Sequence, residues 1–332
     1  MKRAFIRAIE YYLPDSTLTN EQLVERFLDW SPEKIVDKTG IRSRRVVSQS
    51  ELASDLAVAA AERLFQGGVC DTAGIDFILL CTQSPDYALP STSCLIQERL
   101  GIPTSTGAYD FNLGCSGFVY GLSTAKGLIE SGQAENVLLL TSETYTKHLD
   151  ENDISVRAVF GDGAAATLVS GREADSSADE QRIGPFVFGT DGRGAPRLIL
   201  REGSLREKAE HPDQPGAKLH MNGPDIFAFT LKQVPASVNA LLAKSGKTMD
   251  DIDLFVLHQA NKFMLEHLRK KLKIPEEKFV YALEDCGNTV SPTIPIALSR
   301  AATDGQMRSG DLVMLVGFGV GYSWAATLVR WG

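Results

Sequence analysis

Residues 160–171, FGDGAAATLVSG, and residues 317–332, GFGVGYSWAATLVRWG, contain the same pattern, a Gly-x-Gly turn followed by the pentapeptide Ala-Ala-Thr-Leu-Val. Two further pairs of similar segments lie upstream in the same order: GIDFILLCTQ (74–83) with DIDLFVLHQA (251–260), and SGQAENVLLLTSE (131–143) with RSGDLVMLVGFG (308–319). Self-similarity in one order along a chain indicates an internal duplication. We therefore expect two similar halves, residues 1–172 and 173–332.

The repeated segments are short and aliphatic, and their apolar residues do not alternate with polar ones. This pattern is typical of strands that are covered on both faces. Stretches with helical spacing lie between them, such as the one that runs from Cys115 to Gly132. Strands that alternate with helices predict an α/β fold with layered mixed sheets, and the duplication adds a pseudo-twofold axis. Residues 172–220 are polar and rich in Gly and Pro, and we expect them to form a connector with loops.

The composition is that of a soluble globular protein, with 332 residues, 43% hydrophobic and 23% charged. The formal charge is −8 and no segment is strongly basic, which argues against a nucleic-acid partner. The first residues lack the uninterrupted apolar core of a signal peptide, and no apolar run approaches the roughly 20 residues that cross a bilayer. We therefore expect a cytoplasmic protein without a membrane partner. The cysteines form no C-x-x-C pair, so no metal site is expected, and Cys70, Cys81 and Cys94 are interpreted as small buried hydrophobic residues.

The duplication also predicts which chemically active side chains come together. It aligns Cys81 with His258, each of which follows a repeated strand, and it aligns the Cys115 corner with residues 287–301. Because equivalent strand ends converge in a pseudo-symmetric α/β body, we expect Cys115, His258 and Asn288 to share one pocket. Cys115 lies beside glycine at the start of a predicted helix, whose N–H groups and dipole favour a thiolate.

Four segments, NLGCSGFVYGL, VLHQANKFM, CGNTVSPTIPIAL and GFGVGYSWAATLVRWG, resemble the signatures of the β-ketoacyl-acyl-carrier-protein synthase III family, which has the thiolase fold. The stretch DKTGIRSRR (37–45) adds a fifth match. The resemblance implies that Cys115 accepts an acyl group, and that His258 and Asn288 serve the decarboxylation of a malonyl thioester on acyl carrier protein. This reaction is a decarboxylative Claisen condensation with ping-pong kinetics. The backbone N–H groups of Cys115 and Val320 would form the oxyanion hole.

The resemblance also implies binding roles. The substrate pocket would be lined by Leu89, Phe160, Asn261, Phe318 and Gly319, and the docking surface for the carrier protein would consist of Lys262, Arg269, Lys270 and Lys271. A homodimer is implied, in which Leu89 reaches the acyl pocket of the partner subunit. No cofactor is implied, since the substrates are acyl thioesters of coenzyme A or of acyl carrier protein.

Several positions depart from the family pattern. Typical initiating members hold the adenine of coenzyme A between a tryptophan and an arginine, and those positions are Lys34 and Ile154 here. Trp30, four residues before Lys34, is a candidate substitute for the tryptophan. Other departures are Pro224 in place of an asparagine, Leu89 in place of a phenylalanine and Val320 in place of a glycine. These changes favour a donor carried on a protein over coenzyme A, and a pocket for longer or branched acyl chains.

Two other functions stay open at the level of sequence. An acyltransferase of the same fold would pass the acyl group from Cys115 to a hydroxyl or an amine in specialised metabolism, but Asn288 disfavours this because acyl transfer needs no enolate site. A non-catalytic partner subunit would shape a heterodimer, but such subunits tend to lose the cysteine. Thiolase chemistry is not expected, because Phe318 and Val320 stand where a thiolase would carry a second cysteine.

Overall fold

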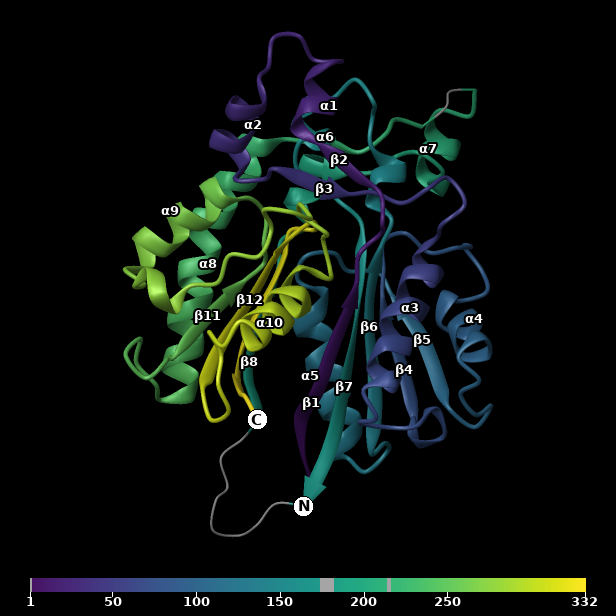
Figure 1. The fold of residues 1–332 in the computed structure, drawn as a ribbon, viewed down its shortest axis with the longest axis vertical. Coiled ribbons are helices and arrows are strands. Elements are labelled where there is room, and N and C mark those ends of the chain that lie inside the picture. The colour runs from purple at the N-terminus through teal and green to yellow at the C-terminus, as the bar shows by residue number, and fades with distance from the viewer. Residues whose placement is uncertain (1, 174–181, 214–215) are drawn as a thin grey trace.

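Two β-sheets alternate with layers of helices in this protein (Figure 1). The structure is a computed structural model that describes residues 2–173, 182–213 and 216–332. The first sheet has the strand order β1 (Lys2–Tyr12), β7 (Gly163–Glu173), β6 (Asn136–Glu143), β4 (Phe77–Cys81), β5 (Gly107–Phe111). The second has the order β11 (Leu254–Leu257), β12 (Leu312–Gly319), β13 (Ser323–Arg330), β8 (Ile183–Thr190).

The helices form three layers around these sheets. Helices α5 (Gly117–Glu130) and α10 (Thr293–Thr303) lie between the sheets, α3 (Ala53–Gln66) and α4 (Thr92–Arg99) cover the first sheet, and α8 (Gly223–Ser245) and α9 (Lys262–Leu272) cover the second. The short elements are β2 (Thr17–Thr19), α1 (Asn20–Val24), α2 (Pro32–Thr39), β3 (Ser43–Arg45), α6 (Ile154–Arg157), β9 (Leu198–Ile199), α7 (Leu205–Glu210) and β10 (His220–Met221). The predicted layered α/β architecture is confirmed.

The two sheets share one pairing scheme. Strands β4, β6, β7 and β1 correspond to β11, β12, β13 and β8, and in each set the first pair is parallel and the next two are antiparallel. The two Ala-Ala-Thr-Leu-Val pentapeptides lie in β7 and β13. Asp76 and Asp253 precede β4 and β11, and their carboxylates accept hydrogen bonds from the N–H groups of Asn136 (2.9 Å) and Leu312 (2.8 Å). The two sheets thus share the same local geometry, as expected of the predicted duplication.

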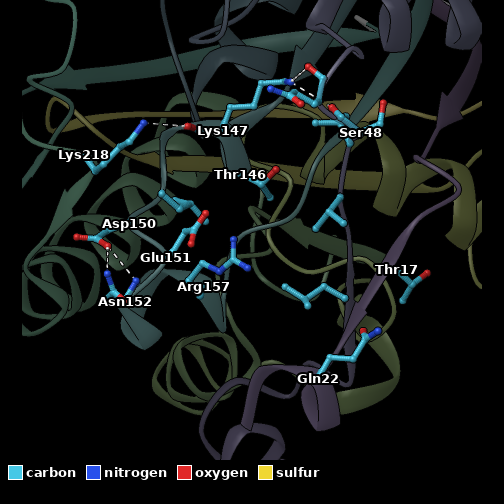
Figure 2. Close-up of a pocket in the computed structure, with 15 residues that line it drawn as sticks. Thr17, Gln22, Ser48, Thr146, Lys147, Asp150, Glu151, Asn152, Arg157 and Lys218 are labelled. Atoms are coloured by element: carbon cyan, nitrogen blue, oxygen red, sulfur yellow. Dashed lines mark hydrogen bonds between the residues drawn. The ribbon is translucent and has the colours of Figure 1, made fainter. Parts of the chain in front are cut away.

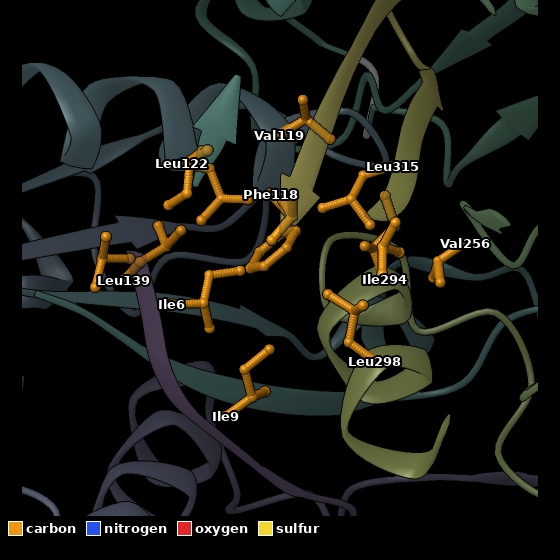
Figure 3. Packing of buried hydrophobic residues seen from close by; sticks show 14 of the residues in the cluster. Ile6, Ile9, Phe118, Val119, Leu122, Leu139, Val256, Ile294, Leu298 and Leu315 are labelled. Carbon is orange, nitrogen blue, oxygen red and sulfur yellow. The ribbon is translucent and has the colours of Figure 1, made fainter. Parts of the chain in front are cut away.

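The core lies where α5 and α10 pack between the sheets (Figure 3). Phe118 and Leu122 of α5 are buried with Ile6 of β1, Leu139 of β6 and Ile294 of α10. Helix α5 contacts strands of both sheets. Each fully buried side chain of this size contributes roughly 1.5–3 kcal/mol. The packing therefore anchors the helix whose start carries Cys115.

Two glycines of α5 have opposite surroundings. A Cβ at Gly117 would lie 2.2 Å from Sγ of Cys81, whereas a Cβ at Gly127 would meet no atom within 4 Å. Gly117→Ala should therefore lower the free energy of unfolding by roughly 1–3 kcal/mol through overpacking. Gly127→Ala should raise it by up to about 1 kcal/mol, because alanine is the better helix former. Urea unfolding measures both variants, and shifts of the same sign would contradict this packing.

The predicted connector is only partly a loop. Residues 183–190 form β8, which pairs with β13 at the edge of the second sheet, so the expectation of loops is wrong there. Pro185 is compatible with this position, because one side of an edge strand needs no ladder hydrogen bond. Helix α7 and strands β9 and β10 also belong to the expected connector. Residues 174–181 and 214–215 of it lie outside the described part of the chain.

One helix in the described part of the chain, α8, has the length and apolar composition of a membrane-crossing helix, with a mean hydropathy of 1.3. It packs against β8, β12, β13 and α9. Val234, Val238 and Leu241 are fully buried in the cluster that it shares with the second sheet. This packing buries one face of α8 against the second sheet.

Candidate active site

Cys115 lies at the corner between β5 and α5 and is 6% exposed. The corner is packed against β12, since a Cβ at Gly319 would lie 2.9 Å from both Cβ and Sγ of Cys115. The next residue, Ser116, shares a 2.8 Å hydrogen bond with the hydroxyl of Ser323 at the start of β13. Gly319, which has no side chain, leaves the space that the sulfur of Cys115 needs. Strands β12 and β13 of the second sheet therefore support the corner that carries Cys115.

His258 follows β11, and its imidazole is buried. Nδ1 lies 2.7 Å from Oγ1 of Thr293, the first residue of α10. The Thr293 hydroxyl donates its single hydrogen to the carbonyl oxygen of Val290 (2.9 Å), so it accepts from Nδ1–H. This arrangement leaves a lone pair on Nε2. Burial lowers the pKa of His258 to about 3, and the ring is therefore neutral at physiological pH.

Asn288 lies in the loop before α10, and its side chain is oriented by the backbone of Val290, two residues further along the chain. Oδ1 accepts a hydrogen bond from the N–H of Val290 at 2.9 Å, which leaves the two amide hydrogens available to a ligand. The backbone of Asn288 bonds to the carbonyl of Val159 (2.9 Å) and to the N–H of Gly161 (3.1 Å). Val290 has a φ of 64°, which is unusual for a β-branched residue. This strained backbone conformation points the N–H of Val290 at Oδ1 of Asn288 and so fixes the orientation of the amide.

One cavity of about 450 Å³ brings the three side chains together, as the duplication predicts. Most of its lining is apolar, and the other polar side chains in it are Tyr145 and Asn261. The predicted site residues that line it are Cys115, Phe160, His258, Asn261, Asn288, Phe318 and Gly319. At its outer end the cavity reaches the first residues of α8 and α9, including Pro224 and Phe263.

Two predicted site residues lie elsewhere. Val320 lines a neighbouring cavity of about 310 Å³, and its backbone N–H favours the thiolate form of Cys115, as an oxyanion-hole donor beside the sulfur would. Leu89 is 83% exposed in the loop after β4. It does not belong to the described lining of either cavity in its own subunit.

The expectation of a resting thiolate is wrong. Burial, together with the nearby carboxyl of Glu143, raises the pKa of Cys115 to about 12, although the N–H groups of Cys115 and Val320 act in the opposite direction. Burial also raises the pKa of Glu143 to about 8. Desolvation of a charged sulfur outweighs the stabilisation that a helix start provides. Cys115 is therefore a thiol at neutral pH, and the base that the cavity offers is Nε2 of His258.

Comparisons with known proteins agree with this geometry. Residues 109–192 match the family model of 3-oxoacyl-[acyl-carrier-protein (ACP)] synthase III, and residues 242–331 match the model of its C-terminal part. A β-ketoacyl-[acyl-carrier-protein] synthase III from Caldanaerobacter subterraneus subsp. tengcongensis is 36% identical over 323 residues, which cover 96% of this chain and 95% of the relative. The chain belongs to the β-ketoacyl-acyl-carrier-protein synthase III family.

Other relatives of this synthase cover its whole length. The β-ketoacyl-[acyl-carrier-protein] synthase III 2 of Bacillus subtilis is 38% identical over 338 residues, all of both chains. A crystal structure of a 3-oxoacyl-(acyl-carrier-protein) synthase III has a TM-score of 0.95 and 51% identity over 99% of this chain and 100% of its own. The priming β-ketosynthase of the R1128 polyketide pathway has a TM-score of 0.90 and 31% identity over 99% and 96%. The predicted thiolase-like fold and family are confirmed.

The raised pKa of Cys115 in the synthase predicts an unusual pH dependence of alkylation. The rate constant with iodoacetamide should keep rising roughly tenfold per pH unit up to pH 10, whereas a small free thiol levels off near its pKa of about 8.5. Peptide mapping after timed alkylation resolves Cys115 from Cys94, which, contrary to expectation, is exposed and serves as the accessible reference. If the alkylation rate at Cys115 levelled off below pH 8, Cys115 would be a thiolate at neutral pH, as the sequence predicted.

The sequence analysis missed the residues that hold this synthase site together. Glu143 ends β6, and its carboxyl accepts hydrogen bonds from the Ser291 hydroxyl (2.7 Å) and from the N–H of Gln83 (2.9 Å). It thereby joins the first sheet to the loop that carries Asn288. Thr293 sets the tautomer of the imidazole. The available signal was position alone, because both residues lie within recognised segments without forming a motif of their own.

The basic residues of α9 are not equivalent. Arg269 is held by Glu266 (Nη2–Oε2 3.0 Å) and by the hydroxyl of Tyr281 (3.2 Å), and its side chain is 15% exposed. The guanidinium of Arg269 is therefore already bound within the subunit, and its docking role stays a prediction. Lys262, Lys270 and Lys271 are exposed and stay in the predicted docking surface.

Trp30 does not reproduce the adenine site of initiating family members. Its ring packs beside Ile154 in a small cluster, and Nζ of Lys34 and Lys38 lie over it at 4.6 and 5.1 Å from the ring centre. The positive charges that lie over the Trp30 ring therefore belong to two lysines of this chain. That coenzyme A is a poor donor stays a prediction.

A separate polar pocket of about 820 Å³ lies beside β2 (Figure 2). Its described lining contains neither cysteine nor histidine. Several of its charged groups have partners in the chain, since Lys147 donates to the carbonyl oxygen of Ser48 (3.1 Å) and Glu151 pairs with Arg26 (2.8 Å). The described lining of this pocket lacks the thiol and imidazole pair, so we place the chemistry in the cavity that contains Cys115.

Proposed function

We propose that the synthase transfers an acyl group to Cys115 and then condenses it with a malonyl thioester on acyl carrier protein, with loss of carbon dioxide. The observation that carries this proposal is the single cavity in which Cys115, His258 and Asn288 meet. Membership in the family supports the same reaction, since the relatives are named β-ketoacyl-[acyl-carrier-protein] synthases. The reaction as written needs no metal and no cofactor beyond the thioester substrates.

The first half-reaction uses the lone pair on Nε2 of His258. The thiol of Cys115 gives its proton to Nε2 as the sulfur attacks the donor carbonyl, and the developing oxyanion accepts hydrogen bonds from the N–H groups of Cys115 and Val320. When the intermediate collapses, the leaving thiolate takes the proton from Nε2. The imidazole then returns to its neutral form with Nδ1–H bonded to Thr293.

The second half-reaction needs donors for an enolate. Loss of carbon dioxide from the malonyl group leaves a negative oxygen, to which the Asn288 amide donates directly. His258 donates from Nε2 in its other tautomer, in which the Thr293 hydroxyl turns from Val290 to Nδ1. A pKa of about 3 keeps the ring neutral, so that it does not protonate the carbanion. The carbanion attacks the acyl carbonyl, and collapse of the tetrahedral intermediate releases Cys115 as a thiolate, which takes a proton from water to return to the thiol.

Steady-state assays with a panel of acyl-carrier donors and malonyl-carrier protein test this function. The proposal expects carbon dioxide and a β-ketoacyl-carrier product in equal amounts. An acyltransferase would instead load Cys115 and pass the acyl group to an added alcohol or amine without consuming malonyl groups. A chain that is never acylated by any donor would be the non-catalytic subunit.

We place the carrier-protein contact on α9, whose first residues lie at the outer end of the cavity and whose Lys262, Lys270 and Lys271 are exposed. The acidic surface expected of the carrier would be attracted to these charges, mainly through the association rate. Replacing Lys270 and Lys271 by glutamate should raise the KM for malonyl-carrier protein about tenfold, which corresponds to about 1.4 kcal/mol. The KM for malonyl-coenzyme A should stay unchanged.

The matched control reverses two charges on α7, Arg206→Glu with Lys208→Glu, which lie away from α9 in Figure 1. This control should leave both KM values as they are. An unchanged KM for malonyl-carrier protein in the α9 variant would remove the docking surface from the proposal.

We further propose that the synthase is a cytoplasmic homodimer in which Leu89 contacts the acyl pocket of the partner subunit. The support is its exposure of 83%, which is high for a leucine. The two halves, residues 1–172 and 173–332, would then supply the cysteine and the His–Asn pair respectively. Sedimentation of the wild type and of Leu89→Asp tests the contact, since a buried aspartate would weaken the dimer.

A further inference from the structure

The cavity on the other side of Cys115 differs from the first. It has a volume of about 310 Å³ and combines apolar side chains, such as Leu200 and Leu219, with the polar side chains of Gln83, Asn112 and Tyr145. Tyr145 and Leu198 line both cavities. Because Val320 lines the second cavity and its N–H acts on the sulfur, Cys115 lies between the two.

The position of the enolate donors decides which substrate each cavity takes. His258 and Asn288 line the first cavity, whose outer end reaches the first residues of α9, the helix that carries the exposed lysines. The carrier-bound thioester therefore approaches Cys115 through the first cavity. The second cavity is left for the acyl group on the sulfur.

Three polar side chains form a chain of hydrogen bonds in the second cavity. The Tyr145 hydroxyl donates to Oε1 of Gln83 (3.2 Å), and Nε2 of Gln83 donates to Oδ1 of Asn112 (3.2 Å). Gln83 lies directly against the nucleophile corner, since a Cβ at Gly114 would be 2.6 Å from its Oε1.

Some amide hydrogens of these side chains have no partner within this chain of hydrogen bonds. One hydrogen on Nε2 of Gln83 and both on the Asn112 amide have no acceptor in the chain of three. Asn112 is exposed and keeps its contact with water, whereas Gln83 is half-buried, so a hydrocarbon tail in this cavity would leave the free amide hydrogen of Gln83 without an acceptor, which costs free energy. An oxygen atom on the tail would satisfy this hydrogen.

We infer that the synthase selects an acyl group that carries a hydroxyl or keto oxygen on its chain, which accepts a hydrogen bond from Gln83 or Asn112. This inference rests on the proposed function. One hydrogen bond of this kind contributes roughly 0.5–1.5 kcal/mol, and the upper end of this range corresponds to the preference of about tenfold that we expect here.

Acylation of Cys115 by matched donors tests the inference. Acyl carrier protein loaded with butyryl or 3-hydroxybutyryl groups, and with hexanoyl or 3-hydroxyhexanoyl groups, is mixed with the synthase, and intact-protein mass spectrometry follows the acyl-enzyme. The wild type should react about tenfold faster with the hydroxylated member of each pair. Gln83→Leu should reduce this ratio to about one, and thermal unfolding checks that the variant is folded.

Two further variants separate the polar network from the size of the cavity. Tyr145→Phe should lower the ratio, because Gln83 loses the partner that orients it. Leu219→Met, in the same cavity, should change both rates together and leave the ratio as it is. Equal rates within each pair in the wild type, or a ratio that survives Gln83→Leu, would overturn the inference while leaving the proposed condensation intact. Absence of any acyl-enzyme with all four donors would instead count against the proposed function.

Discussion

Cys115→Ala is expected to abolish the acyl-enzyme and to lower the rate of condensation by about 10³-fold or more. The side chain is the nucleophile of both half-reactions, since it first accepts the acyl group and then leaves as the product forms. Intact-protein mass spectrometry after exposure to acyl-carrier donors measures the first effect. Release of carbon dioxide coupled to a β-ketoacyl product measures the second.

Cys94→Ser is the matched control, because Cys94 is exposed and lies in α4 on the outer face of the first sheet. This variant should form the acyl-enzyme at the wild-type rate. If Cys115→Ala still carried one acyl group and condensed it at an undiminished rate, the assigned nucleophile would be wrong.

Asn288→Ala should separate the two half-reactions. Its amide donates to the enolate and takes no part in the transfer of the acyl group, so acylation of Cys115 should stay within about threefold of the wild type. Condensation should fall by about 10²–10³-fold, the usual effect of removing one oxyanion donor. Rapid-quench acylation, followed by a malonyl-carrier chase of the isolated acyl-enzyme, measures both steps.

His258→Ala provides the contrast, since His258 is the base of the first step and a donor in the second. Both rates should fall in this variant. Thermal unfolding of the two variants checks that the buried loop before α10 is retained. An equal loss of acylation and condensation in Asn288→Ala would show that Asn288 supports the structure of the site and has no separate role with the enolate.

The fold could be predicted from the sequence because the duplication repeats its strands almost literally. Buried strands such as β4 and β11 carry continuous aliphatic runs, and the pentapeptide of β7 and β13 fixes the correspondence between the halves. Strand β8 was missed because an edge strand that contains Pro185 and lies among polar segments has no such run. Its place is set by pairing with β13, which local sequence does not encode.

In the candidate site, the sequence could predict the positions of those side chains that directly follow or precede a recognisable strand or helix. His258 follows β11 and Asn288 precedes α10, and both positions come from the alignment of the halves. The ionisation of Cys115 was not predictable, because the helix start is local whereas the burial that raises its pKa comes from both halves together. The pairing of Arg269 with Glu266 and Tyr281 likewise depends on contacts between α9 and the chain that follows it.

A pulse-chase of the isolated acyl-enzyme tests the central claim most directly. The synthase is loaded on Cys115, freed of donor and mixed with malonyl-carrier protein whose free carboxyl carbon is labelled. The account predicts that the acyl mass leaves Cys115 at the same rate as labelled carbon dioxide appears, with one β-ketoacyl-carrier product for each acyl group lost. Loss of the acyl group to water, or its retention on Cys115 while the malonyl group stays intact, would contradict a shared cavity for the thiol, the imidazole and the carboxamide.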